Sequence, residues 1–281
     1  MSSITISDEE LHSLTHAILR RYGIDFTGYE PTSFKRRVAR SISVLQLESV
    51  HNLWIKLLRE PPFIYAFINE VSVGLTSMFR DPVLWQTLKN DILKTLNHKK
   101  PIDIWHAGCS TGEEVYSMGI VLQECGLLSQ ARALATDISE AALAVAQAGN
   151  YHTLKMEEYG KQYLTYHPHG LFQRYYRSED TEKVMKPELV QHVDFQNHNL
   201  LTELPPRRFD IIFCRNVMIY FDHASKVKLL NTFYDHLHDG GYLIIGFYDA
   251  LVPLMDKTQY QITNLNAKIF QKTPPCPPAN P

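Results

Sequence analysis

The fold is decided by one stretch, Ile102-Asp-Ile-Trp-His-Ala-Gly-Cys-Ser-Thr-Gly-Glu-Glu114. Its first six residues predict an apolar strand, the next five a turn of small residues, and Glu113–Gln123 a helix. Small residues let a ligand approach the backbone, and a helix start offers free N–H groups. The spacing is not G-x-G-x-x-G, so it predicts no phosphate cradle, and the two glutamates favour a cationic or hydroxyl-bearing ligand. An ordinary strand–helix turn without a ligand is the alternative.

Strands and helices go on alternating after this stretch. Further strands are predicted at Ala131–Thr136, Phe209–Cys214 and Tyr242–Gly246, with a helix from the Ser139 cap to Ala148 and another at Lys226–Leu237. This alternation is typical of an α/β, Rossmann-like fold, a mostly parallel sheet with helices on both faces. The last two strands, Tyr260–Ile262 and Ala267–Gln271, predict an antiparallel edge hairpin.

The residues before the sheet have a helical pattern. Ser7 and Glu10 form a capping box before the first helix, and further helices are expected from Pro31, through Val50–Leu58, over Phe63–Val71 and through Leu84. We therefore predict an all-α domain and linker over 1–95 and a ligand-binding domain over 96–272. A small β insertion is predicted at about 168–197, and the proline-rich segment 273–281 is expected to be a disordered tail.

Composition excludes several classes of protein. The 28 Lys+Arg residues and 30 Asp+Glu residues leave a net charge of −2, which argues against a nucleic-acid-coating protein. We expect no membrane insertion and no secretory signal, because long apolar runs and a basic start are missing. Four scattered cysteines fit a cytoplasmic location, and the histidine spacings predict no metal site.

The strand that follows ends at Asp137, 25 residues after Gly112. An acid at this position can accept hydrogen bonds from both hydroxyls of a ribose. The turn and the acid together predict an adenosine-containing ligand. They do not distinguish a dinucleotide from S-adenosylmethionine.

Four segments then resemble one family. They are Leu75-Thr-Ser-Met-Phe-Arg80, Ala107-Gly-Cys-Ser-Thr-Gly-Glu-Glu-Val-Tyr-Ser117, Ala135-Thr-Asp-Ile-Ser139 and Asp210-Ile-Ile-Phe-Cys-Arg-Asn-Val-Met-Ile-Tyr-Phe-Asp222. In this order and at these separations they resemble the CheR family, the chemotaxis-receptor protein-glutamate O-methyltransferases. The likeness covers about residues 8–272. It implies S-adenosylmethionine as cofactor and methylation of receptor glutamates in sensory adaptation.

The resemblance also assigns residues. Arg80 and Tyr220 would lie at the reacting centre. The cofactor-binding residues would be Thr76, Arg80, Ala107, Glu113, Asp137, Asn199, Leu200, Cys214, Arg215 and Asn216. Two departures stand out: Gly74 occupies a position where many members have asparagine, and Gly246-Phe-Tyr-Asp249 replaces a common Gly-His-Ser-Glu.

The expected protein partner is the cytoplasmic helices of a methyl-accepting chemoreceptor. Residues 31–59 hold six cations and one acid, so a local charge of +5 could steer a glutamate-rich helix. The substrate-binding candidates are Lys35, Arg36, Arg37 and Arg40. The insertion turn Arg177–Glu182 is short, acidic and without glycine, so we predict weak or absent binding of a receptor-tail pentapeptide.

Two alternatives to a receptor methyltransferase stay open, and a third is excluded. The chain could be an S-adenosylmethionine-dependent methyltransferase for another substrate, or a non-catalytic signalling or scaffold protein that binds S-adenosylmethionine. The N-P-P-[YF] amino-methylating motif is missing after the Phe209–Cys214 strand, and Arg80 and Tyr220 are both present, which disfavours each. An NAD oxidoreductase lacks its glycine fingerprint.

Overall fold

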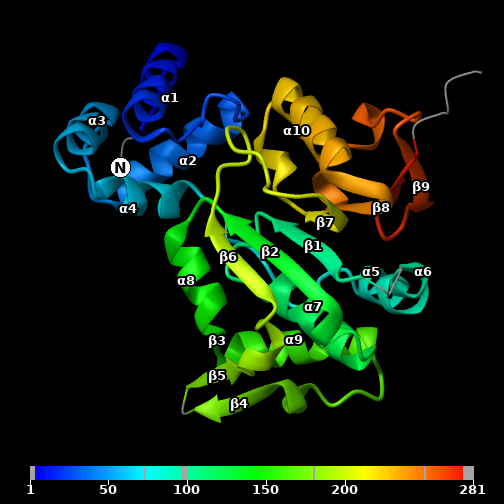
Figure 1. The fold of residues 1–281 in the computed structure, drawn as a ribbon. Coiled ribbons are helices and arrows are strands. Elements are labelled where there is room, and N and C mark those ends of the chain that lie inside the picture. Colours follow the sequence, from blue (N-terminus) through cyan, green and yellow to red (C-terminus); the bar gives the residue numbers. More distant parts are fainter. Residues whose placement is uncertain (1–3, 73, 97–99, 180, 250, 275–281) are drawn as a thin grey trace, which may run out of the picture.

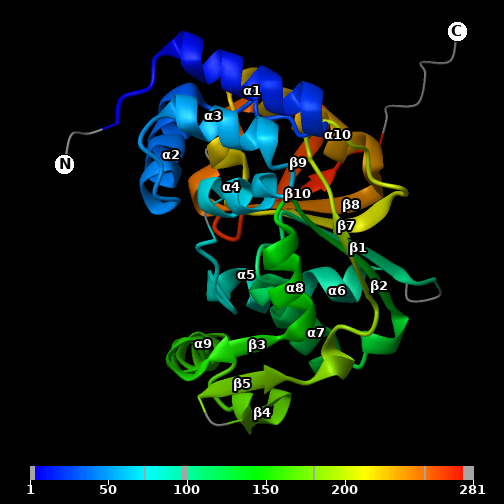
Figure 2. The ribbon, with the colours of Figure 1, turned by 90° about the vertical axis from the view of Figure 1, so that its left-hand side faces the viewer.

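The computed structural model describes residues 4–72, 74–96, 100–179, 181–249 and 251–274. Four helices, α1 (Asp8–Tyr22), α2 (Pro31–Val44), α3 (Val50–Arg59) and α4 (Phe63–Val71), gather at one end of the molecule (Figures 1 and 2). Ser7 caps α1 through the predicted capping box, and Gly23 ends the helix with φ 70°. Buried side chains of all four helices share one apolar cluster, so this end has a core of its own.

A seven-stranded sheet forms the centre of the chain, in the order β6-β2-β1-β7-β8-β10-β9. Its strands are β1 (Ile102–Ala107), β2 (Ala131–Asp137), β6 (Val193–Asn197), β7 (Phe209–Cys214), β8 (Leu237–Ile245), β9 (Tyr260–Asn264) and β10 (Ile269–Lys272). The first five in this order pair in parallel, and β10 runs antiparallel to both β8 and β9. The predicted fold class, a mostly parallel sheet with an antiparallel edge hairpin, is confirmed.

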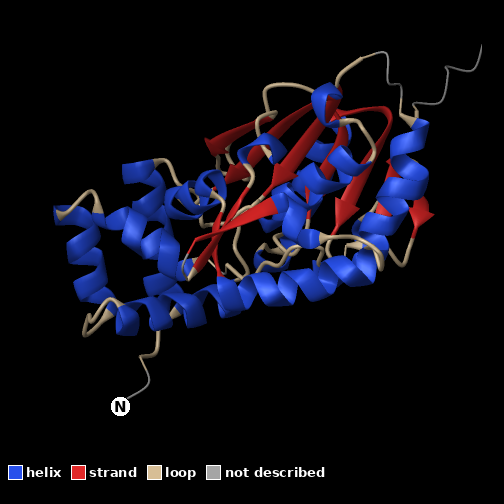
Figure 3. Cartoon of the chain, turned by 90° about the horizontal axis from the view of Figure 1, so that it is seen from below, coloured by secondary structure: helices blue, strands red, loops and turns tan. Residues whose placement is uncertain are grey.

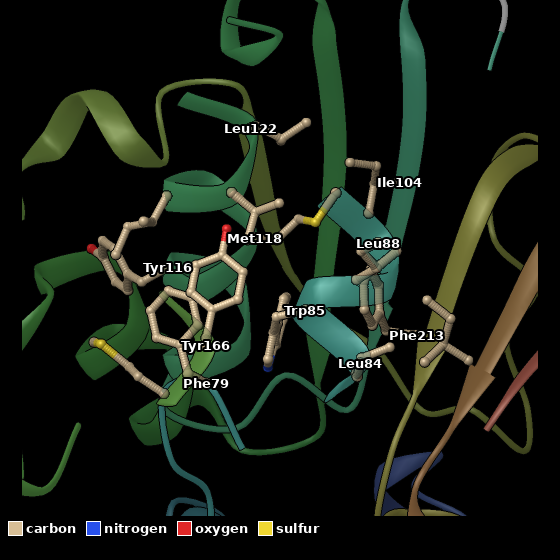
Figure 4. Close-up of a cluster of buried hydrophobic side chains, with 14 of the residues drawn as sticks. Phe79, Leu84, Trp85, Leu88, Ile104, Tyr116, Met118, Leu122, Tyr166 and Phe213 are labelled. Carbon is tan, nitrogen blue, oxygen red and sulfur yellow. The ribbon is translucent and has the colours of Figure 1, made fainter. Parts of the chain in front are cut away.

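Helices cover both faces of the sheet, because alternate strand residues point to opposite sides (Figure 3). On one face lie α5 (Pro82–Thr87), which continues through a π-helical turn at Leu88–Ile92 into α6 (Leu93–Thr95), and α7 (Glu113–Glu124) and α8 (Glu140–Ala148). On the other face lies α10 (His223–His236). Figure 4 shows aromatic side chains from the first face packed between α5 and α7.

A small antiparallel sheet of order β3-β5-β4 lies at the end of the molecule away from α1–α4 (Figure 2). Its strands are β3 (Asn150–His152), β4 (Tyr176–Glu179) and β5 (Glu182–Met185), and α9 (Thr153–Tyr166) lies between β3 and β4 in the chain. The predicted β4–β5 hairpin is present. The structure differs from the predicted insertion of 168–197 at both ends, since β3 joins the small sheet while Val193–Asn197 pairs with β2 in the main sheet.

Two segments near the carboxyl end differ from what the sequence predicts or lie outside the described residues. The turn predicted at Asp239–Gly241 is part of strand β8, where an irregular register against β7 between Phe209 and Ile211 absorbs the extra residues. The disordered tail predicted over 273–281 lies outside the described residues from position 275 onward. Within the part of the chain that the structure describes, no helix has the length and hydropathy to traverse a bilayer.

Glu124, at the end of α7, ties α9 and the turn before β4 to α7. Its carboxylate accepts hydrogen bonds from the hydroxyls of Tyr163 (2.8 Å), Tyr166 (2.7 Å) and Tyr175 (3.1 Å) and pairs with the Lys89 ammonium at 2.6 Å. Burial alone would raise the pKa of Glu124, but these donors hold the pKa below its usual value.

We expect Glu124→Gln to lower the free energy of unfolding at pH 7 by about 2 kcal/mol, because it leaves buried donors facing a neutral amide. The folded-state pKa lies below the unfolded value, so the carboxylate stabilises the fold above the unfolded pKa and loses this effect as pH falls through the folded pKa. The deficit of the variant should therefore shrink on acidification below about pH 4.5. Urea titrations from pH 3 to 7 measure this deficit, with Glu157→Gln, an exposed acid on α9, as control. A deficit that does not change with pH would contradict this assignment.

Candidate active site

A cavity of about 420 Å³ opens at the carboxyl ends of the parallel strands. The strand order reverses between β1 and β7, from which β2 and β6 extend one way and β8 the other. Ligands of open α/β sheets bind at such a reversal, and the volume suits a nucleoside-sized molecule. The turns after β1, β2 and β7 line the cavity, together with residues of α2 and of the segment 74–80.

The turn after β1 comes close to its neighbours because it contains glycine at two tight positions. Gly108 has φ 81°, and a Cβ there would lie 2.4 Å from Val217 Cγ2. Gly112 has φ 90° at the start of α7, and a Cβ there would lie 2.8 Å from the Ala146 Cβ. A larger residue at Gly108 would be strained and would push the turn away from Val217, and one at Gly112 would push it away from α8.

Asp137 lies at the end of β2 and joins two of the turns. Its carboxylate accepts hydrogen bonds from the backbone N–H of Ser110 (2.8 Å) and of Ser139 (2.9 Å). Burial raises the pKa of Asp137, although its backbone hydrogen bonds oppose the rise. The carboxylate borders the cavity, where further lone pairs can accept ribose hydroxyls.

The helical end of the molecule contributes one wall. The backbone of Gly28 to Glu30 pairs with that of Tyr220 to Asp222, through Glu30 N–H to Tyr220 O and Asp222 N–H to Gly28 O, both at 2.9 Å. The Arg37 guanidinium lies 4.5 Å from the centre of the Tyr220 ring and donates to the Val71 carbonyl. Arg37 is only 8% exposed, and burial lowers its pKa.

The segment around Arg80 also lines the cavity. Phe79 and Asp81 both have left-handed backbone, with φ 53° and 57°. The Phe79 N–H donates to Ser117 Oγ at 2.9 Å, and the Trp85 indole N–H donates to the Arg80 carbonyl at 2.9 Å. Non-glycine residues rarely adopt this conformation, and such strain concentrates at functional sites.

The structure brings most of the predicted site residues to this cavity. Thr76, Arg80, Asp137, Asn199, Leu200, Arg215, Asn216, Tyr220 and Arg37 line it. Three of the predicted cofactor-binding residues do not: Ala107, Glu113 and Cys214 are buried behind the wall. The Glu113 carboxylate accepts the Tyr159 hydroxyl at 2.9 Å and the Thr111 hydroxyl at 2.6 Å, so it supports the turn from behind.

The other predicted substrate-binding cations lie outside the cavity. Arg36 and Arg40 are exposed on α2, whereas the Lys35 ammonium pairs with Asp8 at 2.6 Å. The basic helix therefore divides into a buried arginine at the cavity and an exposed positive face.

Sequence reasoning missed Asp249, the last residue of the Gly246–Asp249 segment that departs from the family's Gly-His-Ser-Glu. Its carboxylate is 1% exposed and accepts the N–H groups of Asn216 (2.8 Å), Ile219 (3.2 Å) and Gly246 (2.6 Å). It thus fixes the turn that carries Tyr220. The signal was available, because an acid closes both this loop and the family's Gly-His-Ser-Glu.

A group with metal-like spacing lies at the other end of the sheet. Asp103, Asp210 and His238 can place ligand atoms within 4.8 Å of one another. Asp103 already pairs with Arg132 and Arg207 at 2.7 and 3.0 Å, and Asp210 pairs with Lys100 at 2.8 Å. These cations take up the charge of both acids, so the group serves as a structural ion network.

Comparisons with known proteins cover both ends of the molecule. The family model "CheR methyltransferase, all-alpha domain" matches residues 9–72, and "CheR methyltransferase, SAM binding domain" matches residues 74–269. The Cher3 protein of Pseudomonas putida is 33% identical over 251 residues, which cover 89% of this chain and 92% of Cher3. Chemotaxis protein methyltransferase 1 of Vibrio cholerae is 30% identical over 281 residues, 97% of this chain and 99% of its own. The chemotaxis protein methyltransferase of Listeria innocua is 29% identical over 261 residues, 92% and 95% of the two chains.

Proposed function

The chain belongs to the CheR methyltransferase family, and we propose that it transfers the methyl group of S-adenosylmethionine to glutamate side chains of chemoreceptors. The resemblance and the cofactor expected from the sequence are confirmed by the two family matches. The observation that carries the proposal is the cavity at the strand reversal, which Asp137, Arg80 and Tyr220 all line.

The residues at the cavity fit this cofactor. The volume of about 420 Å³ suits a nucleoside with an amino-acid arm, and the Asp137 carboxylate, which borders the cavity, would accept two ribose hydroxyls. Asn199 and Leu200 would flank the adenine, and Thr76, Arg215 and Asn216 would border the rest of the ligand. When bound, S-adenosylmethionine supplies an electrophilic methyl group on a sulfonium sulfur.

The substrate glutamate needs no general base. Its pKa is near 4.3, so it is already an anion at pH 7, and its oxygen forms the new C–O bond as the C–S bond breaks. The products are a glutamyl methyl ester and S-adenosylhomocysteine, and both charges disappear. The task left to the protein is to remove water and aim the carboxylate at the methyl group.

Arg80 and Tyr220 are suited to this task because they border the same cavity from different elements. Arg80 would hold the substrate carboxylate through its guanidinium N–H groups. The hydroxyl of Tyr220 would fix the sulfonium end or the attacking oxygen. The Arg37 guanidinium lies over the ring of Tyr220, so α2 would border the reacting centre.

The exposed cations of α2 are proposed to bind the receptor. Chemoreceptor methylation helices are rich in glutamate, and Arg36 and Arg40 present positive charge beside the cavity wall that Arg37 forms. Receptor methylation occurs on cytoplasmic helices, so we place the protein in the cytoplasm.

We expect the KM for a receptor fragment to rise by at least about threefold between 0.05 and 0.5 M NaCl, because salt screens exposed charges. The double variant Arg36→Gln/Arg40→Gln should raise KM at low salt and flatten this dependence. Lys257→Gln, an exposed cation near the carboxyl end, is the control. Initial rates at varied receptor concentration give the KM at each salt concentration. A wild-type KM that does not respond to salt would count against the proposal.

Tethering by a receptor-tail peptide is proposed to be weak. Strands β3 and β4 are the edges of the small sheet, and a peptide could add beside β4 as a further strand. Glu179 and Glu182 flank the β4–β5 turn and would repel a terminal carboxylate. Calorimetry with the carboxyl-terminal pentapeptide of a chemoreceptor should show no saturable binding, and submicromolar affinity would refute the prediction.

The experiment that tests the proposed function uses S-adenosylmethionine labelled in its methyl group and a panel of chemoreceptor cytoplasmic fragments. Label that enters a fragment and is released as methanol by mild base identifies a glutamyl ester. Label in a base-stable form or in another acceptor would favour a different methyltransferase. Cofactor binding without transfer to any acceptor would favour the non-catalytic alternative.

A further inference from the structure

The side chain of Arg215 is committed to protein groups. It is 4% exposed, and its Nη1 donates to Glu114 Oε2 at 3.1 Å. Its Nη2 donates to Asp81 Oδ2 at 2.6 Å and to the Arg80 carbonyl at 3.2 Å. The guanidinium also lies over the Trp85 ring. Arg215 lines the cavity, but its guanidinium is almost fully buried and both terminal nitrogens donate to protein acceptors.

Glu114 supports this arginine from behind. One carboxylate oxygen faces Arg215, and the other lies 2.8 Å from Nδ1 of His106. Burial alone would raise the pKa of Glu114, but His106 and Arg215 keep it below its usual value. The His106 ring is 1% exposed and stacked on Phe213. Glu114 is therefore held by a residue of strand β1 that packs on strand β7.

On its other side, Arg215 contacts the backbone segment that carries Arg80. The two neighbours of Arg80 hold left-handed backbone, a conformation that non-glycine residues keep only where the surroundings enforce it. Here the Asp81 side chain and the Arg80 carbonyl are both held by Arg215, and Trp85 donates a second hydrogen bond to the same carbonyl.

We propose that Arg215 is a positioning residue for Arg80 and that its side chain is not a ligand of S-adenosylmethionine. Glu114, Arg215 and Asp81 form an ion clamp that fixes the backbone at Arg80 and so directs its guanidinium to the cavity. The clamp rests on the proposed function in one respect, namely that Arg80 orients the substrate carboxylate. It replaces the assignment of the Arg215 side chain that the family resemblance implies.

Two variants weaken the clamp without emptying the site. Arg215→Lys keeps the charge, but an ammonium cannot replace the planar fork that joins Glu114 to Asp81. Asp81→Asn removes the anion, and asparagine tolerates left-handed backbone. The Asp81 side chain is 48% exposed, so this variant should fold even where the other does not. Arg207→Lys, in the ion pair with Asp103 at the far end of the sheet, is the matched control.

Each clamp variant should lower kcat by at least about tenfold with a chemoreceptor fragment. The Kd for S-adenosylhomocysteine and the KM for S-adenosylmethionine should stay within about threefold of wild type. The double variant should be no slower than Arg215→Lys alone, because both substitutions break the same bond. A loss of cofactor affinity as large as the loss in kcat would overturn the proposal and make the side chain a cofactor ligand.

A second measurement does not depend on the acceptor. In the complex with S-adenosylhomocysteine, amide hydrogen exchange of peptides within residues 74–85 should be faster in both clamp variants and unchanged in the control. Unchanged exchange there would overturn the proposal. If the wild-type protein methylates no chemoreceptor fragment, the proposed function fails, while exchange and calorimetry still decide whether Arg215 acts on the Arg80 segment or on the cofactor.

Discussion

Replacing Asp137 with alanine should weaken binding of S-adenosylhomocysteine by at least about 100-fold, because hydrogen bonds to a charged acceptor are worth about 1.5–3 kcal/mol each. Two effects add in this variant. The ribose loses its carboxylate, and the turn after β1 loses the acceptor for the Ser110 N–H. Asp137→Asn keeps the shape and one acceptor oxygen and should fall between alanine and wild type.

Isothermal calorimetry measures this affinity, and thermal melting without ligand checks that the variants fold. Asp194→Ala removes an exposed acid on the adjoining strand β6 and should bind like wild type. Because burial raises the pKa of Asp137, wild-type affinity should also weaken on acidification earlier than an ordinary aspartate would titrate. An alanine variant with affinity within about threefold of wild type would show that the acid only holds the backbone of the turns after β1 and β2.

Local signals allowed the strand–turn–helix unit to be predicted closely. The strand Ile102–Ala107 and the helix start at Glu113 are as the sequence indicates, because buried parallel strands are continuously apolar and glycine marks their ends. The helix Phe63–Val71 matches for a similar reason, since prolines precede it.

The elements that depend on distant partners were harder to predict. Strand β6 is mostly polar and exposed, so only its pairing with β2 shows that it belongs to the main sheet. Helix α9 buries Tyr159, Tyr163 and Tyr166, whose hydroxyls need the carboxylates of α7. Tyrosines at a helical spacing are ambiguous until those acceptors are known.

Within the site, the direction of single side chains could not be predicted from the sequence either. Glu113 and Glu114 are adjacent on α7 and therefore point about 100° apart. The sequence cannot say which one faces the strand ends, and the structure turns Glu113 toward Tyr159 and Glu114 toward Arg215. The role of Asp249 likewise depends on a close approach of β8 to the turn after β7.

The second large effect concerns Arg80 itself. Arg80→Ala should lower kcat by at least about tenfold. Loss of a donor that stabilises charge in the transition state typically lowers kcat by on the order of 100-fold. The backbone at this position is held by Arg215 and Trp85 through the Arg80 carbonyl, which alanine retains. The fold and the left-handed neighbours should therefore survive the loss of the guanidinium.

The measurement is release of base-labile methyl label from a chemoreceptor fragment, with calorimetry for S-adenosylhomocysteine on the same preparation. Arg80→Lys is the informative companion, because it keeps a positive charge but loses the two-pronged contact with a carboxylate. If orientation of the anion is the task of Arg80, lysine should recover only part of kcat. Near-wild-type transfer by the alanine variant would remove Arg80 from the reacting centre, and with it the reason for the strained backbone on either side.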